Sequence, residues 1–220
     1  ERVNRVTDIG RKLKSKLKQD PERYSEPQRV RLHRAISWLG RAEAEVSDDD
    51  AKFIFLWISF NAAYAKEFGL DESERDRLAQ FIQVLLSADS EKHLHQLLFK
   101  QFSGPIRTLL DNQFVFEPFW RALREHDSSN RWEEKFAGSK KAALCSIMLG
   151  DTAKVLSIVF DRLYVLRNQL VHGGATWNSK VNREQLKDGT AIMMAITPII
   201  IALMLEHPEM DFGEIMYPVI

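Results

Sequence analysis

Three polar side chains stand where an amphipathic helix would be expected to finish burying leucines. The stretch from Tyr164 to Thr176 reads YVLRNQLVHGGAT and contains Arg167, Asn168 and His172 just before two glycines. The imidazole of a histidine such as His172 can donate or accept a proton in acid–base chemistry. The guanidinium of Arg167 keeps its charge and offers a forked set of donors to anionic oxygens. These residue types permit acid–base chemistry beside a bound anion.

The spacing of these residues decides how their functional groups can meet. At about 100° per residue, Arg167 falls within the apolar stripe of the predicted helix, and Asn168 and His172 share an adjacent face. Arg167 and His172 are about 140° apart, so a single helix does not bring their functional groups together. We therefore expect either that Arg167 bends round the helix, or that a second copy packs alongside and a homodimer completes the site.

A structural interpretation of the same residues stays open. His172 can favour the negative end of the helix dipole, Arg167 can take part in an ion pair, and Gly173 can be the left-handed residue that ends the helix. The spacing alone does not separate this interpretation from a functional one.

The motif resembles that of a known family. Arg167 and Asn168, then three residues, then His172 before two glycines, resemble the signature of the HEPN superfamily, whose members are small helical domains of bacterial toxin–antitoxin and phage-defence systems. The aromatic-rich segment FLWISFNAAYA, residues 55–65, is similar to an early helix of the Apea-like branch. The resemblance extends over about residues 28–206.

The resemblance implies a metal-independent endoribonuclease that acts on RNA without a cofactor, with the motifs of two protomers meeting across a cleft. His172 would transfer a proton, and Arg167 would stabilise the charge of the phosphorane. Asn168 would orient His172 or donate to the phosphate. Gly173 and Gly174 would let the RNA backbone approach closely. The alternative is a catalytically inactive HEPN-like domain that binds a nucleotide or a protein partner such as an antitoxin.

Other polar residues are weaker candidates. Asn61 lies within an otherwise apolar segment and could line the same cleft, or it could have a structural role. His93 and His95 would point about 200° apart on a helix, so we expect no shared metal. Cys145, the only cysteine, has apolar neighbours and is interpreted as a small core residue.

Helical spacing dominates the chain, and it predicts an all-α fold. The resemblance implies, more specifically, a helical bundle of the HEPN type with additional helices. We expect a basic N-terminal arm and linker over residues 1–27, one helical domain over residues 28–206, and a tail over residues 207–220. The core is predicted from the three most apolar runs, residues 53–64, 155–170 and 192–205. Three consecutive aspartates, residues 48–50, predict the start of the first of these helices.

Composition places few limits on function. The 31 basic and 31 acidic side chains balance, so no global field attracts nucleic acid or a membrane. The arm is locally basic, which fits either a solvated amphipathic helix or contact with phosphates. The most apolar run, residues 191–205, is short and contains Pro198, and it predicts a core helix instead of a membrane span. We expect a cytoplasmic protein.

Overall fold

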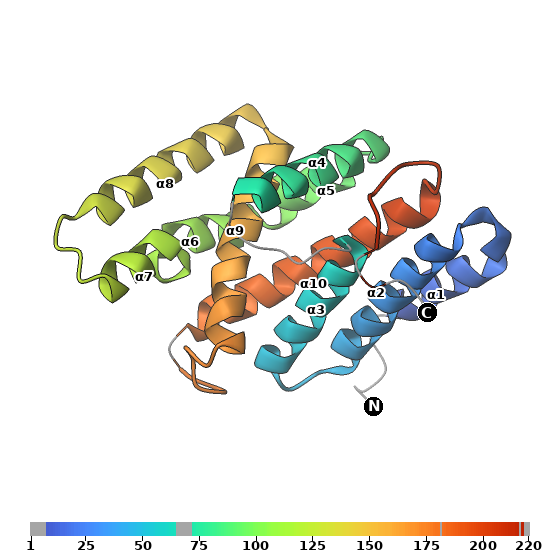
Figure 1. Ribbon diagram of the computed structural model, residues 1–220, viewed down its shortest axis with the longest axis horizontal. Coiled ribbons are helices and arrows are strands. Elements are labelled where there is room, and N and C mark those ends of the chain that lie inside the picture. Colours follow the sequence, from blue (N-terminus) through green and yellow to red (C-terminus); the bar gives the residue numbers. More distant parts are fainter. Residues whose placement is uncertain (1–7, 65–71, 181, 216, 218–220) are drawn as a thin grey trace.

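The described part of the chain is built from helices. The computed structural model describes residues 8–64, 72–180, 182–215 and 217, and these residues contain no strand. The all-α prediction is confirmed (Figure 1). The helices are α1 (Ile9–Gln19), α2 (Glu26–Ala44), α3 (Asp49–Tyr64), α4 (Glu72–Ala88), α5 (His93–Gln96), α6 (Ser103–Asp111), α7 (Glu117–Arg124), α8 (Arg131–Leu149), α9 (Thr152–Val171) and α10 (Arg183–Glu206). Three short turns of 3₁₀ or π type lie between them: η1 (Pro21–Arg23), η2 (Leu97–Gln101) and η3 (Gln113–Val115).

Helix α9 lies between two groups of helices. In Figure 1, α6, α7 and α8 lie on one side of it, α1, α2 and α3 lie on the other, and α10 crosses it. Helix α3 packs against α2, α10 and α9, and its Phe53 and Phe60 are fully buried. The rings of Phe60 and Phe160 stack with their centroids 4.4 Å apart. The three apolar runs that the sequence predicted thus lie in the core, together with buried residues of α2, α4 and α6.

Helix α10 is the one helix in the described residues that is long and apolar enough, by length and composition alone, to cross a membrane. Most of its apolar positions are buried inside the protein, as in a core helix. Gly189 lets α10 approach its neighbours, because a Cβ there would lie 3.0 Å from Leu166 Cδ2 and 3.1 Å from Leu163 Cδ2.

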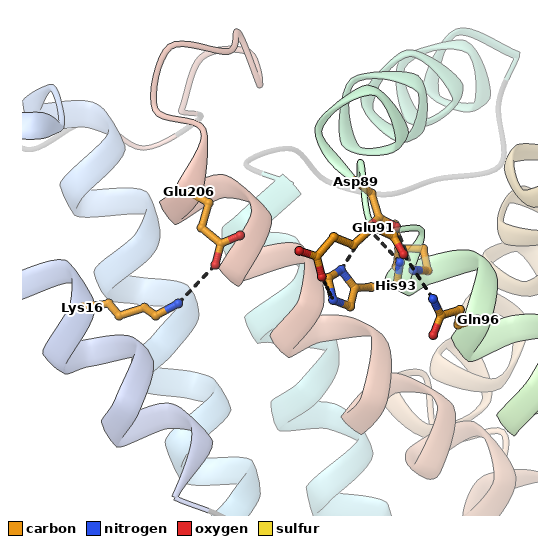
Figure 2. Close-up of polar contacts among 7 residues, drawn as sticks. Lys16, Asp89, Glu91, His93, Gln96 and Glu206 are labelled. Atoms are coloured by element: carbon orange, nitrogen blue, oxygen red, sulfur yellow. Dashed lines mark hydrogen bonds and ion pairs between the residues drawn. The ribbon is translucent and has the colours of Figure 1, made fainter.

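The basic N-terminal segment is part of the packed structure. Leu13 and Leu17 of α1 are buried against the core, whereas the lysines of α1 are exposed. Lys16 Nζ lies 3.1 Å from Glu206 Oε1 at the end of α10 (Figure 2). In the predicted linker, Tyr24 is buried and its hydroxyl donates to the carbonyl of Leu205 at 2.9 Å. Residues 8–27 thus pack against the helical domain as an amphipathic helix and a short connection.

The tail after α10 also lies against α2. The Gln28 amide donates to the carbonyl of Pro208 at 2.7 Å, and the guanidinium of Arg31 donates to the carbonyl of Gly213. The tail is irregular, as predicted, and side chains of α2 satisfy its carbonyls.

The prediction that Cys145 is a core residue is wrong. Its side chain is exposed, because α8 buries only Ala143 and Ser146 and turns its other faces outward. Apolar neighbours in the sequence did not indicate burial here, because this helix packs along a narrow stripe.

The two neighbouring histidines face different partners. His93 lies between two carboxylates, with Nδ1 at 3.1 Å from Asp89 Oδ1 and Nε2 at 3.3 Å from Glu91 Oε2 (Figure 2). His95 Nδ1 lies 2.9 Å from Thr152 Oγ1 at the start of α9. Each histidine thus makes a polar contact near the start of a helix, His93 at the start of α5 and His95 with the start of α9.

The aromatic stack between α3 and α9 should be a main source of stability. Replacing Phe160 by Ala removes a ring that is 1% exposed, and we expect a loss of about 3–5 kcal/mol in the free energy of unfolding. Leu149→Ala, at a position that is 83% exposed, is the control and should change this free energy by less than about 0.5 kcal/mol. Urea denaturation measures both variants, and equal losses would contradict the assigned core.

Candidate functional site

The polar motif lies at the C-terminal end of α9. The carboxylate of Asp151 accepts from the backbone N–H of Lys154 at 3.0 Å and caps the start of this helix. The helix ends at Val171, and His172 is its C-cap residue, whose N–H donates to the carbonyl of Asn168 at 3.0 Å. Gly173 has a φ of 69°, the left-handed conformation that glycine adopts most easily at a helix end. Gly173 therefore has a structural role, because it ends the helix.

Arg167 is half-buried and has no carboxylate partner among the described residues. Its Nη1 donates to Asn168 Oδ1 at 2.9 Å, and its guanidinium carbon lies 6.0 Å from the centroid of the Tyr164 ring. Its Nε is buried and has no hydrogen-bond partner. Among the described residues, Arg167 therefore takes part in no ion pair, and its Nε donor is unused.

His172 is exposed, and its ring makes no hydrogen bond in the described part of the chain. The structure thus brings Arg167 and Asn168 into direct contact, and no hydrogen bond joins the imidazole of His172 to either of them among the described residues. For Arg167 this agrees with the helix geometry, because residues five positions apart point in directions about 140° apart.

Two aspartates at the start of α3 anchor the loop that follows the motif. Asp48 Oδ2 accepts from Trp177 Nε1 at 2.9 Å. Asp50 Oδ2 accepts from the guanidinium of Arg183 at 2.8 Å and from the backbone N–H of Asn178 at 3.3 Å. The sequence indicated these aspartates only as the start of a helix, and their second role depends on partners far along the chain.

The carboxylate of Asp48 has two hydrogen-bond donors. The backbone N–H of Ala51 donates to Oδ1 at 3.0 Å, and together with the indole of Trp177 it holds the pKa of Asp48 below its usual range. The same side chain therefore caps α3 and fixes the loop, and both functions favour its ionised form.

Gln169 is a further residue that the sequence did not indicate. Its Nε2 donates to the carbonyl of Phe114 at 2.6 Å, and its Oε1 accepts from Asn182 at 3.2 Å. Gly174 packs on it, because a Cβ there would lie 3.4 Å from both the Cα and the carbonyl oxygen of Gln169. Gln169 thus connects the motif helix to the segments on either side of it.

The loop that follows the motif leaves almost no free space between itself and the adjoining helices. The cavity between Asp50, Gln169 and Arg183 measures about 10 Å³, which is room for no more than about one water molecule. A substrate of the motif must therefore approach from the outer surface, where His172 and Gly173 are exposed.

Asn61 is on α3, next to Phe60, whose ring stacks on Phe160 of α9. Its Oδ1 is buried and has no hydrogen-bond partner among the described residues. No hydrogen bond within the described residues therefore joins the Oδ1 of Asn61 to Arg167 or His172.

No known family model, curated protein or solved structure matches this chain. The inference of function therefore depends on the residues themselves and on their geometry.

The hydrogen bonds that the carboxylate of Asp48 accepts predict a pH dependence of the free energy of unfolding. Because its pKa is lowered in the folded state, its stabilising effect is complete above the ordinary aspartate pKa of about 3.9 and is lost as the pH falls through the lowered value. Asp48→Asn keeps a capping oxygen but does not titrate. We therefore expect its free energy of unfolding to fall less than that of the parent protein between about pH 5 and pH 2.

Asp49→Asn is the matched control, since it removes the same charge in the same helical turn. The carboxylate of Asp49 accepts no hydrogen bond in the described part of the chain. Urea titrations at each pH give the comparison. The same decline in Asp48→Asn and Asp49→Asn would mean that the contacts of Asp48 do not stabilise the fold.

Proposed function

We propose that this chain is a HEPN-type, metal-independent endoribonuclease that acts as a homodimer, in a toxin–antitoxin or phage-defence setting. The observation that carries the proposal is the environment of Arg167. A half-buried guanidinium with no carboxylate partner among the described residues is costly to keep unless an anion binds it. RNA phosphate is such an anion.

The hydrogen bond between Arg167 and Asn168 assigns a role to each. The amide oxygen of Asn168 accepts from Arg167 and fixes the direction of the guanidinium. The amide N–H groups of Asn168 are then the ones that can donate to a second phosphate oxygen. The guanidinium would stabilise the charge that develops on the phosphorane.

His172 has the properties of a group that transfers protons. It is exposed beside Gly173, where no described residue other than the two chain neighbours comes within 4 Å of the position of a Cβ, so a ribose–phosphate backbone can reach the imidazole. It would deprotonate the 2′-hydroxyl or protonate the leaving 5′-oxygen. Because its ring is held by no hydrogen bond within the described residues, a partner protomer or the RNA must orient it.

Exposed apolar side chains around the motif support self-association at this end of the molecule. Val171 precedes His172, Trp177 lies in the loop that follows it, and Val46 lies two residues before the aspartate that holds Trp177. Val46 is 82% exposed and Trp177 is 69% exposed. Apolar groups gathered beside a polar motif favour a protein–protein contact, and a two-fold contact here would bring two copies of the motif together.

The decisive variant is His172→Ala. We expect purified protein to cleave total RNA in the presence of EDTA, and His172→Ala to lose this cleavage while its stability changes by less than about 0.5 kcal/mol, because the side chain is exposed. Arg167→Lys keeps the positive charge but loses the forked set of guanidinium donors, so it should retain only part of the activity. Gel electrophoresis of the RNA and thermal unfolding give the two readouts.

His33→Ala is the control, since His33 is also exposed but lies on α2. Undiminished cleavage by a folded His172→Ala protein would exclude the catalytic role. A parent protein that binds RNA or a nucleotide but does not cleave RNA would favour the catalytically inactive HEPN-like domain.

A site that is completed by two protomers, here called the composite site, predicts that self-association and RNA cleavage change together. Val46→Lys should shift the protein toward monomer and reduce RNA cleavage, because it places a charge in the apolar surface beside the motif. Leu149→Lys introduces the same charge at an equally exposed position on α8 and should leave both unchanged. Sedimentation velocity and the RNA assay measure the pair, and a monomer that cleaves RNA as fast as the parent would exclude the composite site.

A further inference from the structure

A second cavity lies on the opposite side of α9 from Arg167. It measures about 220 Å³ and is enclosed by residues of α4, α7, α8 and α9, with Phe116 before α7. Three arginines line it, Arg75, Arg121 and Arg162. Arg162 and Arg167 are five positions apart and point in directions about 140° apart, so this cavity is separate from the motif.

Arg162 is the buried group of this cavity. It is 3% exposed, and its Nη2 donates to Ser139 Oγ at 3.1 Å. Its guanidinium carbon lies 4.5 Å from the centroid of the Phe116 ring. Ser139 and Phe116 also line the cavity, so the guanidinium forms part of its wall. Nε is buried and has no hydrogen-bond partner among the described residues.

The charge of Arg162 is poorly compensated. Burial lowers the pKa of Arg162 to about 10, and the neighbouring Asp161 only partly opposes this effect. No carboxylate lies within ion-pair distance of its guanidinium in the part of the chain that the structure describes. A buried cation without a paired anion is unfavourable, so a bound anion would stabilise it.

The two carboxylates that line the cavity form ion pairs with arginines other than Arg162. Asp161 pairs with Arg75 at 3.6 Å, and burial raises the pKa of Asp161. Glu117 accepts from Arg121 at 2.9 Å and also pairs with Arg124. Three guanidinium groups thus face two carboxylates along the wall, which leaves an excess of positive charge.

We infer that this cavity binds a phosphoryl group, either as inorganic phosphate or as the phosphate of a small nucleotide. Its volume is below the roughly 300–1,000 Å³ of sites for drug-sized ligands, which suits a compact oxyanion. Guanidinium groups match phosphate oxygens in charge and in fork geometry. Arg162 contributes a buried positive charge to the wall, and Arg121 and Arg75 supply donors from the rim. This inference does not depend on the proposed ribonuclease activity.

A competing role for Arg162 is structural. Its guanidinium also lies 5.6 Å from the centroid of the Phe136 ring, so cation–π contacts with two phenylalanines could join α8 and α9 without any ligand. A binding measurement separates these roles, because a purely structural arginine would confer no affinity for phosphate.

The test uses the full chain and isothermal titration calorimetry at constant ionic strength, with inorganic phosphate in one arm and uridine 5′-monophosphate in the other. We expect binding in at least one arm, and Arg121→Gln or Arg75→Gln should weaken it by about tenfold, the loss of one charged hydrogen bond. Binding of phosphate itself would identify the free ion as sufficient. Binding of the nucleotide alone would identify the nucleotide as the source of the phosphoryl group.

Arg124→Gln is the matched control. Arg124 pairs with the same Glu117 as Arg121 does, but only Arg121 lines the cavity, so Arg124→Gln should keep the affinity of the parent. These arginines are exposed at the rim, and their variants should fold even where Arg162→Gln does not. Absence of binding in both arms at millimolar concentration, or an equal loss in Arg121→Gln and Arg124→Gln, would overturn the inference.

Discussion

The packing of α9 between two groups of helices is the constraint on which the rest of the structure depends. On one side, Phe160 stacks on Phe60 of α3, and on the other, α9 contacts α6 and α8. A helix enclosed in this way has little surface for charged side chains, yet it carries Arg162 and Arg167. Neither has a carboxylate partner within the described residues, and each has a buried Nε without a hydrogen bond. The cost of burying these two charges is the physical basis of both proposed phosphate sites.

Helix α3 couples the core to the surface of the motif. Its middle supplies the buried aromatic rings, and Asp48, which precedes it, and Asp50 in its first turn supply the carboxylates that hold the loop after His172. A displacement of α3 would therefore move the loop and the end of α9 together. This coupling fixes the backbone around His172 while its imidazole stays exposed, an arrangement that a partner protomer or a bound RNA can complete.

The balanced net charge of the chain does not argue against phosphate binding. Electrostatic recognition depends on local charge and on burial, and a single desolvated guanidinium contributes more than several solvated lysines. The lysines of α1 are exposed, and Lys16 is paired with Glu206, so they form a weak local field. Arg162, by contrast, is 3% exposed, and Arg167 is half-buried with a buried Nε.

The sequence by itself determined the all-α class, the three core helices and the position of the polar motif, because helical periodicity and capping act over a few residues. It also indicated that Arg167 and His172 would not meet on one helix. The tertiary structure alone decided that Asp48 binds Trp177, that Asp50 binds Arg183, and that Ser139 and Phe116 enclose Arg162. It also decided that Cys145 is exposed. Partners of this kind are brought together by the packing of whole helices, and no local spacing encodes which distant side chain will satisfy a buried charge.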